Sequence, residues 1–152
     1  MIRLARSGDE QTVAERGETE RVRAGAELGR IFPAFPSAGT IELSIAAGGR
    51  WYLDDAEPRT AMHAYLEDNG KVYVTLVYGP SETRLERLLF LAEDLLATYG
   101  NRIGVFPDAG TPETDDAKVA TGARLVGKWY EIRLQDGRDA LRAAIAAREK
   151  QR

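Results

Sequence analysis

Residues 61–100 constrain the fold more than any other part of the chain, because they predict a β-hairpin followed at once by a long helix. Asn69 and Gly70 are the residue pair that a type I′ turn favours, since both of its central positions need a positive φ angle. That turn would place Tyr65 opposite Val74. Apolar residues occur on both faces of the hairpin, which is typical of strands well inside a sheet.

The helix after the hairpin is predicted from its apolar periodicity. Thr83 followed three residues later by Glu86 predicts a capping box at its start, and Gly100 predicts a left-handed residue at its end. Its apolar side chains recur at the i, i+3, i+4, i+7 spacing of one buried stripe, and they are Leu85, Leu88, Leu89, Ala92, Leu95, Leu96 and Tyr99. The helix should therefore bury one continuous face.

Phe90 lies on the side of this helix opposite the stripe, because each residue turns about 100° around the helix axis. Its neighbours on that side include Glu86 and Arg87. Single apolar residues are common on protein surfaces, and the N-terminal part of the chain could also cover this ring. The alternative is a contact with another chain, which makes Phe90, Glu86 and Arg87 candidate interface residues.

Composition places the chain among ordinary globular proteins. Its 152 residues, 43% of them hydrophobic and 30% charged, suit a single domain. The net charge of −3 makes nucleic-acid binding an improbable function, since that needs a basic surface. No cysteine is present for a disulfide, a thiolate nucleophile or a Cys-based zinc site. The chain has neither an apolar run of membrane-spanning length nor the apolar core of a signal peptide, so we expect a cytoplasmic protein without membrane contact.

The remaining segments alternate between helix and strand signals. Residues 1–36 predict a charged N-terminal arm with a helix near residues 18–31, and residues 37–152 predict a single α+β domain. Residues 107–122 predict a long loop without secondary structure, and such loops are usually functional or disordered. Strands are predicted at residues 40–46, 50–53, 102–106 and 123–134, and a last helix at Asp136. The sequence therefore predicts an α+β fold with a mostly antiparallel sheet of about five to six strands, a long central helix and flanking N- and C-terminal helices.

Two carboxylates and the chain's one histidine are the nearest approach to a catalytic cluster. Asp54 and Asp55 follow a predicted strand, and with His63 they could share acid–base chemistry around a pocket. Consecutive carboxylates, however, point in different directions and are also common turn residues. For His63, a hydrogen-bonded histidine beside the core is the favoured explanation. One histidine cannot build a two-histidine metal site, so no metal and no cofactor are expected.

Further charged and turn residues suggest binding rather than catalysis. Glu113, Asp115 and Asp116 in the predicted long loop lack the spacing of a calcium loop, but they could attract a basic partner surface. The Gly79-Pro80-Ser81 turn at a helix start resembles an anion site, because free amide groups point outward there. No Lys follows that turn, and Glu82 already supplies a negative charge, so we do not expect phosphate binding.

Trp51-Tyr52 and Trp129-Tyr130 are paired aromatic steps on two predicted strands. Side chains alternate across a strand, so one ring of each pair should lie in the core and the other outside. Outward aromatic rings are frequent anchors of interfaces. Core packing is the default explanation for these rings, and the alternative makes Trp51 and Trp129 candidate interface residues.

The favoured interpretation is a non-enzymatic protein-interaction or assembly module of bacterial or phage origin. It could be an adaptor, an immunity or antitoxin-type inhibitor, or a phage virion component, with another protein or a second copy in a homo-oligomer as its partner. The element order resembles small phage tail-terminator proteins and bacterial secretion-chaperone-like domains, without a shared residue motif. The alternative is a small enzyme or ligand-binding domain that uses Asp54, Asp55 and His63.

Overall fold

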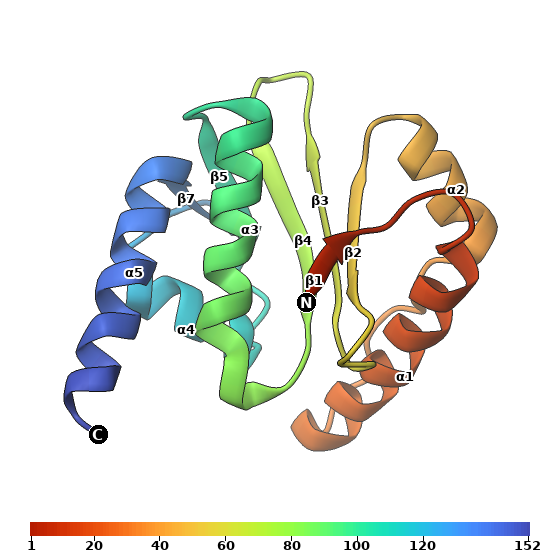
Figure 1. Cartoon of the computed structure of the whole chain (residues 1–152), viewed down its shortest axis with the longest axis horizontal. Helices are drawn as coiled ribbons and strands as arrows, with labels where there is room; N and C mark the ends of the chain where they lie inside the picture. Colours follow the sequence, from red (N-terminus) through yellow and green to blue (C-terminus); the bar gives the residue numbers. More distant parts are fainter. The chain divides into compact units, whose positions relative to one another are not determined.

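The computed structural model describes all of residues 1–152. The chain forms an α+β fold with five α-helices and a seven-stranded sheet in the order β1-β2-β3-β4-β5-β7-β6 (Figure 1). The predicted fold class and the mostly antiparallel sheet are confirmed, although the sheet has seven strands. The contacts define a first unit of Met1–Ala64 with Leu76–Pro80 and a second unit of Tyr65–Thr75 with Ser81–Arg152.

The first unit packs two helices against three strands. β1 and β3 both pair antiparallel with β2. The core is formed by Ala5, Val13, Ile41, Trp51 and Leu53, with Ala14, Phe35, Ile45 and Leu76 packed against it. Its elements are β1 (Ile2–Leu4), α1 (Glu10–Leu28), α2 (Ala38–Ala46), β2 (Arg50–Asp54) and the start of β3 (Ala61–Leu66).

Both helices of the first unit differ from their predictions. α1 begins well before the predicted residues 18–31 and ends where Gly29 adopts a left-handed φ of 63°. The predicted strand over residues 40–46 is wrong, because this segment is α2. Its apolar residues fit either period, but the Ser37 side chain accepts a hydrogen bond from the Thr40 amide and so starts a helix. Ile41 is then buried, while Leu43 is 73% exposed.

The second unit packs three helices against the rest of the sheet. α3 and α5 lie side by side in Figure 1, drawn in green and blue. The buried apolar residues of this unit are Val72, Leu88, Leu91, Ala92, Leu95, Val105, Ala117, Tyr130, Leu134 and Leu141. The elements are β4 (Val72–Tyr78, which continues into the first unit), a 3₁₀ turn at Ser81–Thr83, α3 (Arg84–Tyr99), β5 (Ile103–Pro107), α4 (Pro112–Thr121), β6 (Arg124–Val126), β7 (Trp129–Arg133) and α5 (Leu134–Lys150).

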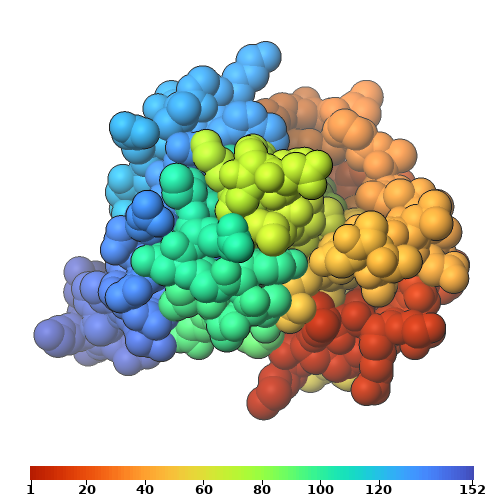
Figure 2. All heavy atoms as spheres, turned by 90° about the horizontal axis from the view of Figure 1, so that it is seen from above, coloured from red at the N-terminus to blue at the C-terminus, as the bar shows by residue number.

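The β3–β4 hairpin is present where predicted, but its turn is different. Only glycines have positive φ angles, so Asn69 does not, and the type I′ turn is wrong. The Glu67 amide donates to the Lys71 carbonyl, and the Gly70 amide donates to the Glu67 carbonyl, which makes a three-residue loop with a left-handed Gly70. Figure 2 shows this yellow-green tip beside the teal end of α3, where Arg102 donates to the Gly70 carbonyl.

Two further predictions in the second unit are wrong. Residues 107–122 are not structureless, because Thr111 caps α4 and Pro112 occupies its first turn. Residues 123–134 are not one strand, because Gly127 adopts a left-handed φ of 63° and turns the chain back as the β6–β7 hairpin. β5, the long helix α3 and the last helix lie close to their predicted positions. None of the helices is long and apolar enough to cross a membrane.

Candidate functional site

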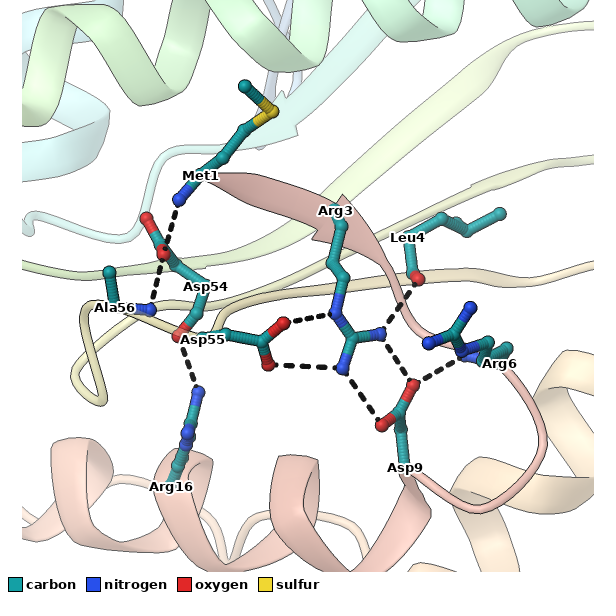
Figure 3. A network of polar contacts seen from close by, with 9 residues as sticks. All are labelled: Met1, Arg3, Leu4, Arg6, Asp9, Arg16, Asp54, Asp55 and Ala56. Atoms are coloured by element: carbon teal, nitrogen blue, oxygen red, sulfur yellow. Dashed lines mark hydrogen bonds and ion pairs between the residues drawn. The ribbon is translucent and has the colours of Figure 1, made fainter.

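Asp54 and Asp55 are bound by cations of the first unit (Figure 3). The N-terminal ammonium of Met1 donates to Asp54 Oδ1 at 2.8 Å. The guanidinium of Arg3 lies between Asp55 and Asp9, with Nε–Oδ2 and Nη1–Oδ2 distances of 2.7 Å to the two carboxylates. This network joins β1 to the end of β2 and to the start of α1.

The network keeps its carboxylates charged. Hydrogen bonds from Arg3 lower the pKa of Asp9 to about 2 and also lower the pKa of Asp55. Partial burial raises the pKa of Asp54, but hydrogen bonds from the Met1 ammonium and the Ala56 amide outweigh that effect, and the pKa is lowered. Carboxylates held in this way are poor proton acceptors, since a general base works best with a pKa near the ambient pH.

His63 faces a different side of the sheet from Asp54. It pairs with Trp51 across β2 and β3, and the two rings stack at 4.1 Å. Because side chains alternate along a strand, Asp54 points to the face opposite Trp51. Burial lowers the pKa of His63 to about 4. The structure therefore does not bring Asp54 and His63 together, and no group of three or more acidic or histidine side chains is arranged around a metal position.

The flank of α3 that carries Phe90 lies against the chain's own last helix. Glu86 forms an ion pair with Arg148 of α5, and Glu93 forms one with Arg142 of α5 at 3.0 Å. Phe90 lies between these two glutamates on the same helix face and is half-buried. Arg87 is only 2% exposed, and its Nη1 donates to Thr83 Oγ1 at 2.8 Å.

The other candidate interface residues have different environments. Trp51 is 3% exposed in the core of the first unit, whereas Trp129 is 39% exposed on β7. Glu113, Asp115 and Asp116 lie in the first two turns of α4 rather than in a loop. Two of these three acidic residues bind Arg84 of α3, while Asp115 is exposed.

The topology marks the starts of α3 and α4, both in the second unit, as the best candidate for a ligand site. β4 and β5 form a parallel pair, with Val72 opposite Gly104 and Tyr73 opposite Val105. In open sheets with parallel strands, ligands bind beyond the carboxyl ends of those strands. α4 follows the carboxyl end of β5, and α3 begins after β4. The starts of α3 and α4 therefore define this candidate site.

Arg84 connects the starts of these two helices. Its Nη1 lies 2.9 Å from Asp116 Oδ2 and its Nε lies 3.8 Å from Glu113 Oε1, both in α4. All three side chains are at least partly buried. Sequence reasoning missed this contact, because it depends on a helix that was predicted to be a loop.

The two helix starts are capped differently. In α4, the Thr111 side chain accepts a hydrogen bond from the Thr114 amide at 3.3 Å. In α3, Thr83 makes no such bond and its hydroxyl accepts from Arg87 instead, so the predicted capping box is wrong. First-turn amides without a side-chain cap, together with the helix dipole, favour an anion. In the sequence, the feature that pointed to an anion site at this helix start was the Gly79-Pro80-Ser81 turn.

Comparison with known proteins gives one informative result. No protein-family model matches the chain, and no curated protein matches it in sequence. Its fold is similar to the crystal structure of a GNAT-family acetyltransferase from Listeria monocytogenes 4b F2365, with a TM-score of 0.64. The match covers 88% of this chain and 94% of that one, at 15% sequence identity. At this identity the likeness establishes the fold.

This likeness corrects the interpretation drawn from the sequence. A non-enzymatic interaction or assembly module was predicted, but the fold that the chain shares is that of a GNAT-family acetyltransferase. The main support of that interpretation was the absence of a catalytic motif in the sequence.

Proposed function

We propose that the chain is an acyltransferase that moves an acetyl group from a coenzyme A thioester to a nucleophilic acceptor. The observation that carries this proposal is the fold shared with a GNAT-family acetyltransferase over nearly the full length of both chains. The starts of α3 and α4, at the carboxyl ends of the parallel strands, support it. The cytoplasmic location expected from the sequence belongs to the same proposal.

The residues at the start of α3 suit the charged part of such a donor. Coenzyme A supplies an activated acyl thioester and carries phosphate groups. Anionic groups bind well at a helix start whose amides lack a side-chain cap, which is the state of α3. Arg84 and Arg87 add positive charge there, and the contacts of Arg84 with α4 keep its side chain at this edge. Glu82 opposes the binding, since it is an exposed carboxylate at the same turn.

Acyl transfer places two further demands on the chain. The attacking atom of the acceptor must lose its proton to a base, and negative charge develops on the carbonyl oxygen of the acetyl group. Backbone amides can stabilise that oxygen without any conserved side chain. This is consistent with a sequence that shows no catalytic motif.

The direct test is thiol release from acetyl coenzyme A in the presence of a panel of amines. The chain contains no cysteine, so a thiol reagent reports only the coenzyme A that is released. Binding alone can be measured as thermal stabilisation, because a ligand at about 100 times its Kd adds about 2.7 kcal/mol. At about 2–4 °C per kcal/mol for a chain of this size, Tm should rise by about 5–10 °C.

Arg84→Gln is the informative variant, and Arg142→Gln is its matched control. Both substitutions remove one arginine that is ion-paired to a carboxylate of a neighbouring helix. Arg84→Gln should weaken binding of coenzyme A at least about tenfold, the factor expected when a charge-assisted hydrogen bond is lost, and Arg142→Gln should leave it unchanged. The proposal fails if coenzyme A at millimolar concentration neither stabilises the chain nor is released from its acetyl ester.

A further inference from the structure

The start of α3 carries a negative charge of its own. Glu86 lies in the first turn of α3, and the side chains of a helix lean toward its N-terminus, so the Glu86 carboxylate lies toward the first-turn amides. A carboxylate there stabilises the helix, because it interacts favourably with the helix dipole. For the same reason it competes with any anion that binds at these amides.

The last turn of α5 lies beside this carboxylate. α3 and α5 run antiparallel (Figure 1), since Glu86 near the start of α3 pairs with Arg148 in the last turn of α5, and Glu93 farther along α3 pairs with Arg142 earlier in α5. The carboxyl end of a helix carries a partial negative charge. Without Arg148, the end of α5 and the Glu86 carboxylate would together place negative charge at the start of α3.

Arg148 binds both oxygens of Glu86. Its Nη2 donates to Glu86 Oε1 and its Nη1 donates to Glu86 Oε2 at 3.4 Å, while its buried Nε has no acceptor. The hydrogen bonds from Arg148 lower the pKa of Glu86 most, its own backbone amide also lowers it, and these effects outweigh partial burial, which raises it. Glu86 is therefore ionised at neutral pH, and Arg148 balances its charge.

The arginines at the start of α3 have other partners. Arg84 is bound by two carboxylates of α4, and Arg87 donates from its Nη1 to the hydroxyl of Thr83. The ion pair of Glu86 is made by Arg148. The charge that balances the first turn of α3 therefore comes from α5.

We propose that Arg148 is a positioning residue of the donor site. It holds the Glu86 carboxylate on the flank of α5 and neutralises it, which leaves the start of α3 positive enough to bind the phosphate groups of coenzyme A. Arg148 does not contact the donor and acts through Glu86. The inference rests on the proposed acyltransferase function and makes the last turn of α5 part of its donor site.

The alternative is that this ion pair only fastens α5 to α3. A second pair on the same flank provides the comparison, since Glu93 and Arg142 join the same two helices with the same chemistry at 3.0 Å. Glu93 lies two turns beyond Glu86, about 10 Å along the helix axis. Salt screens exposed charges over about that distance, so the second pair fastens α5 without acting on the start of α3.

The test is calorimetric titration of the full chain with coenzyme A after each partner of the pair has been replaced. Arg148→Gln leaves Glu86 uncompensated and should raise the Kd about three- to fivefold, whereas Glu86→Gln leaves Arg148 uncompensated and should lower it by a similar factor. A pair that only fastens α5 predicts the same direction for both, because each substitution breaks it. Both side chains are partly exposed, and such pairs add little stability, so both variants should fold.

Further variants separate charge from packing. The double variant Arg148→Gln with Glu86→Gln removes both charges and should return the Kd close to that of the unchanged chain. Arg148→Lys keeps the positive charge and should also bind nearly as well. Glu93→Gln and Arg142→Gln, the matched controls, should leave the Kd unchanged. Raising the salt to about 0.5 M should shrink the differences among the variants, because the effect is electrostatic.

The outcomes distinguish this inference from the proposed function. If the unchanged chain does not bind coenzyme A at millimolar concentration, the proposed function is wrong and the inference is wrong with it. If the unchanged chain binds, three results overturn the inference alone. Arg148→Gln and Glu86→Gln shift the Kd in the same direction, either of them leaves it unchanged, or Glu93→Gln shifts it as much as Glu86→Gln does.

Discussion

His63 should make the stability of the chain depend on pH below about pH 6.5. Burial lowers its pKa to about 4 from an ordinary 6.5, so the folded state binds the proton less readily than the unfolded state. The contribution of neutral His63 is fully present above about pH 6.5 and is lost as pH falls toward 4. The carboxylates with lowered pKa values, such as Asp9 at about 2, lose their contribution only below about pH 4.

The size of the effect follows from the shift. Each pKa unit is worth about 1.4 kcal/mol, so lowering the pH from about 6.5 to 5 should cost about 2 kcal/mol of unfolding free energy. For a chain of this length that corresponds to a fall in Tm of about 4–8 °C. Urea unfolding at a series of pH values, followed by circular dichroism, measures the slope directly.

The chain has one histidine, so the assignment can be checked without ambiguity. The imidazole Hε1 resonance should not titrate above about pH 5. His63→Phe retains a ring to stack on Trp51 and should remove the slope between about pH 6.5 and 5. The reasoning is refuted if the wild-type stability is flat over that range, or if the imidazole titrates near its ordinary pKa.

Three further substitutions test packing, a buried ion pair and a helix cap by urea unfolding. Gly17→Ala should destabilise the chain by about 1–3 kcal/mol, because the new Cβ would lie 2.1 Å from the Phe35 ring. The control Gly39→Ala in α2, where the new Cβ meets no close neighbour, should be neutral or stabilising. Equal effects of the two substitutions would contradict this prediction. Glu20→Gln should lower the unfolding free energy by about 1–3 kcal/mol, since Glu20 is buried and accepts a hydrogen bond from Arg59 at 3.2 Å. A loss no larger than that of the exposed control Glu42→Gln would show that this ion pair does not stabilise the chain. Thr111→Ala should lower the unfolding free energy by about 1 kcal/mol, because it removes the side-chain cap of α4. Thr98, an exposed threonine in α3, provides the control, and a loss no larger than that of Thr98→Ala would show that the cap does not stabilise α4.

Local signals predicted some elements correctly because those elements depend on their own residues. α3 carries an uninterrupted apolar stripe, and the β3–β4 hairpin carries Asn69-Gly70 at its tip. The strand predicted at residues 40–46 was wrong because the pattern there is ambiguous. Ile41, Leu43 and Ile45 fit the alternation of a strand, while Ile41 and Ile45 also fit one helix face. Capping by Ser37 decides between the two.

The candidate site was harder to predict because it is made by contacts between elements. α4 has few apolar residues, so periodicity did not reveal it, although Thr111-Pro112 is a standard helix start. Without α4, the partners of Arg84 could not be identified. The contact of this flank of α3 with α5 was missed for a related reason, since a second helix packs where the apolar stripe leaves off.

The last helix has a consequence for any shortened form of this protein. The 17 residues of α5 shield the half-buried ring of Phe90 and neutralise the two glutamates on either side of it. A chain that stopped ahead of Leu134 would expose that ring, remove the buried Leu134 and Leu141, and leave uncompensated acid beside fresh apolar surface. Aggregation of such a fragment would result from the loss of α5 and would not show that the intact chain binds a partner.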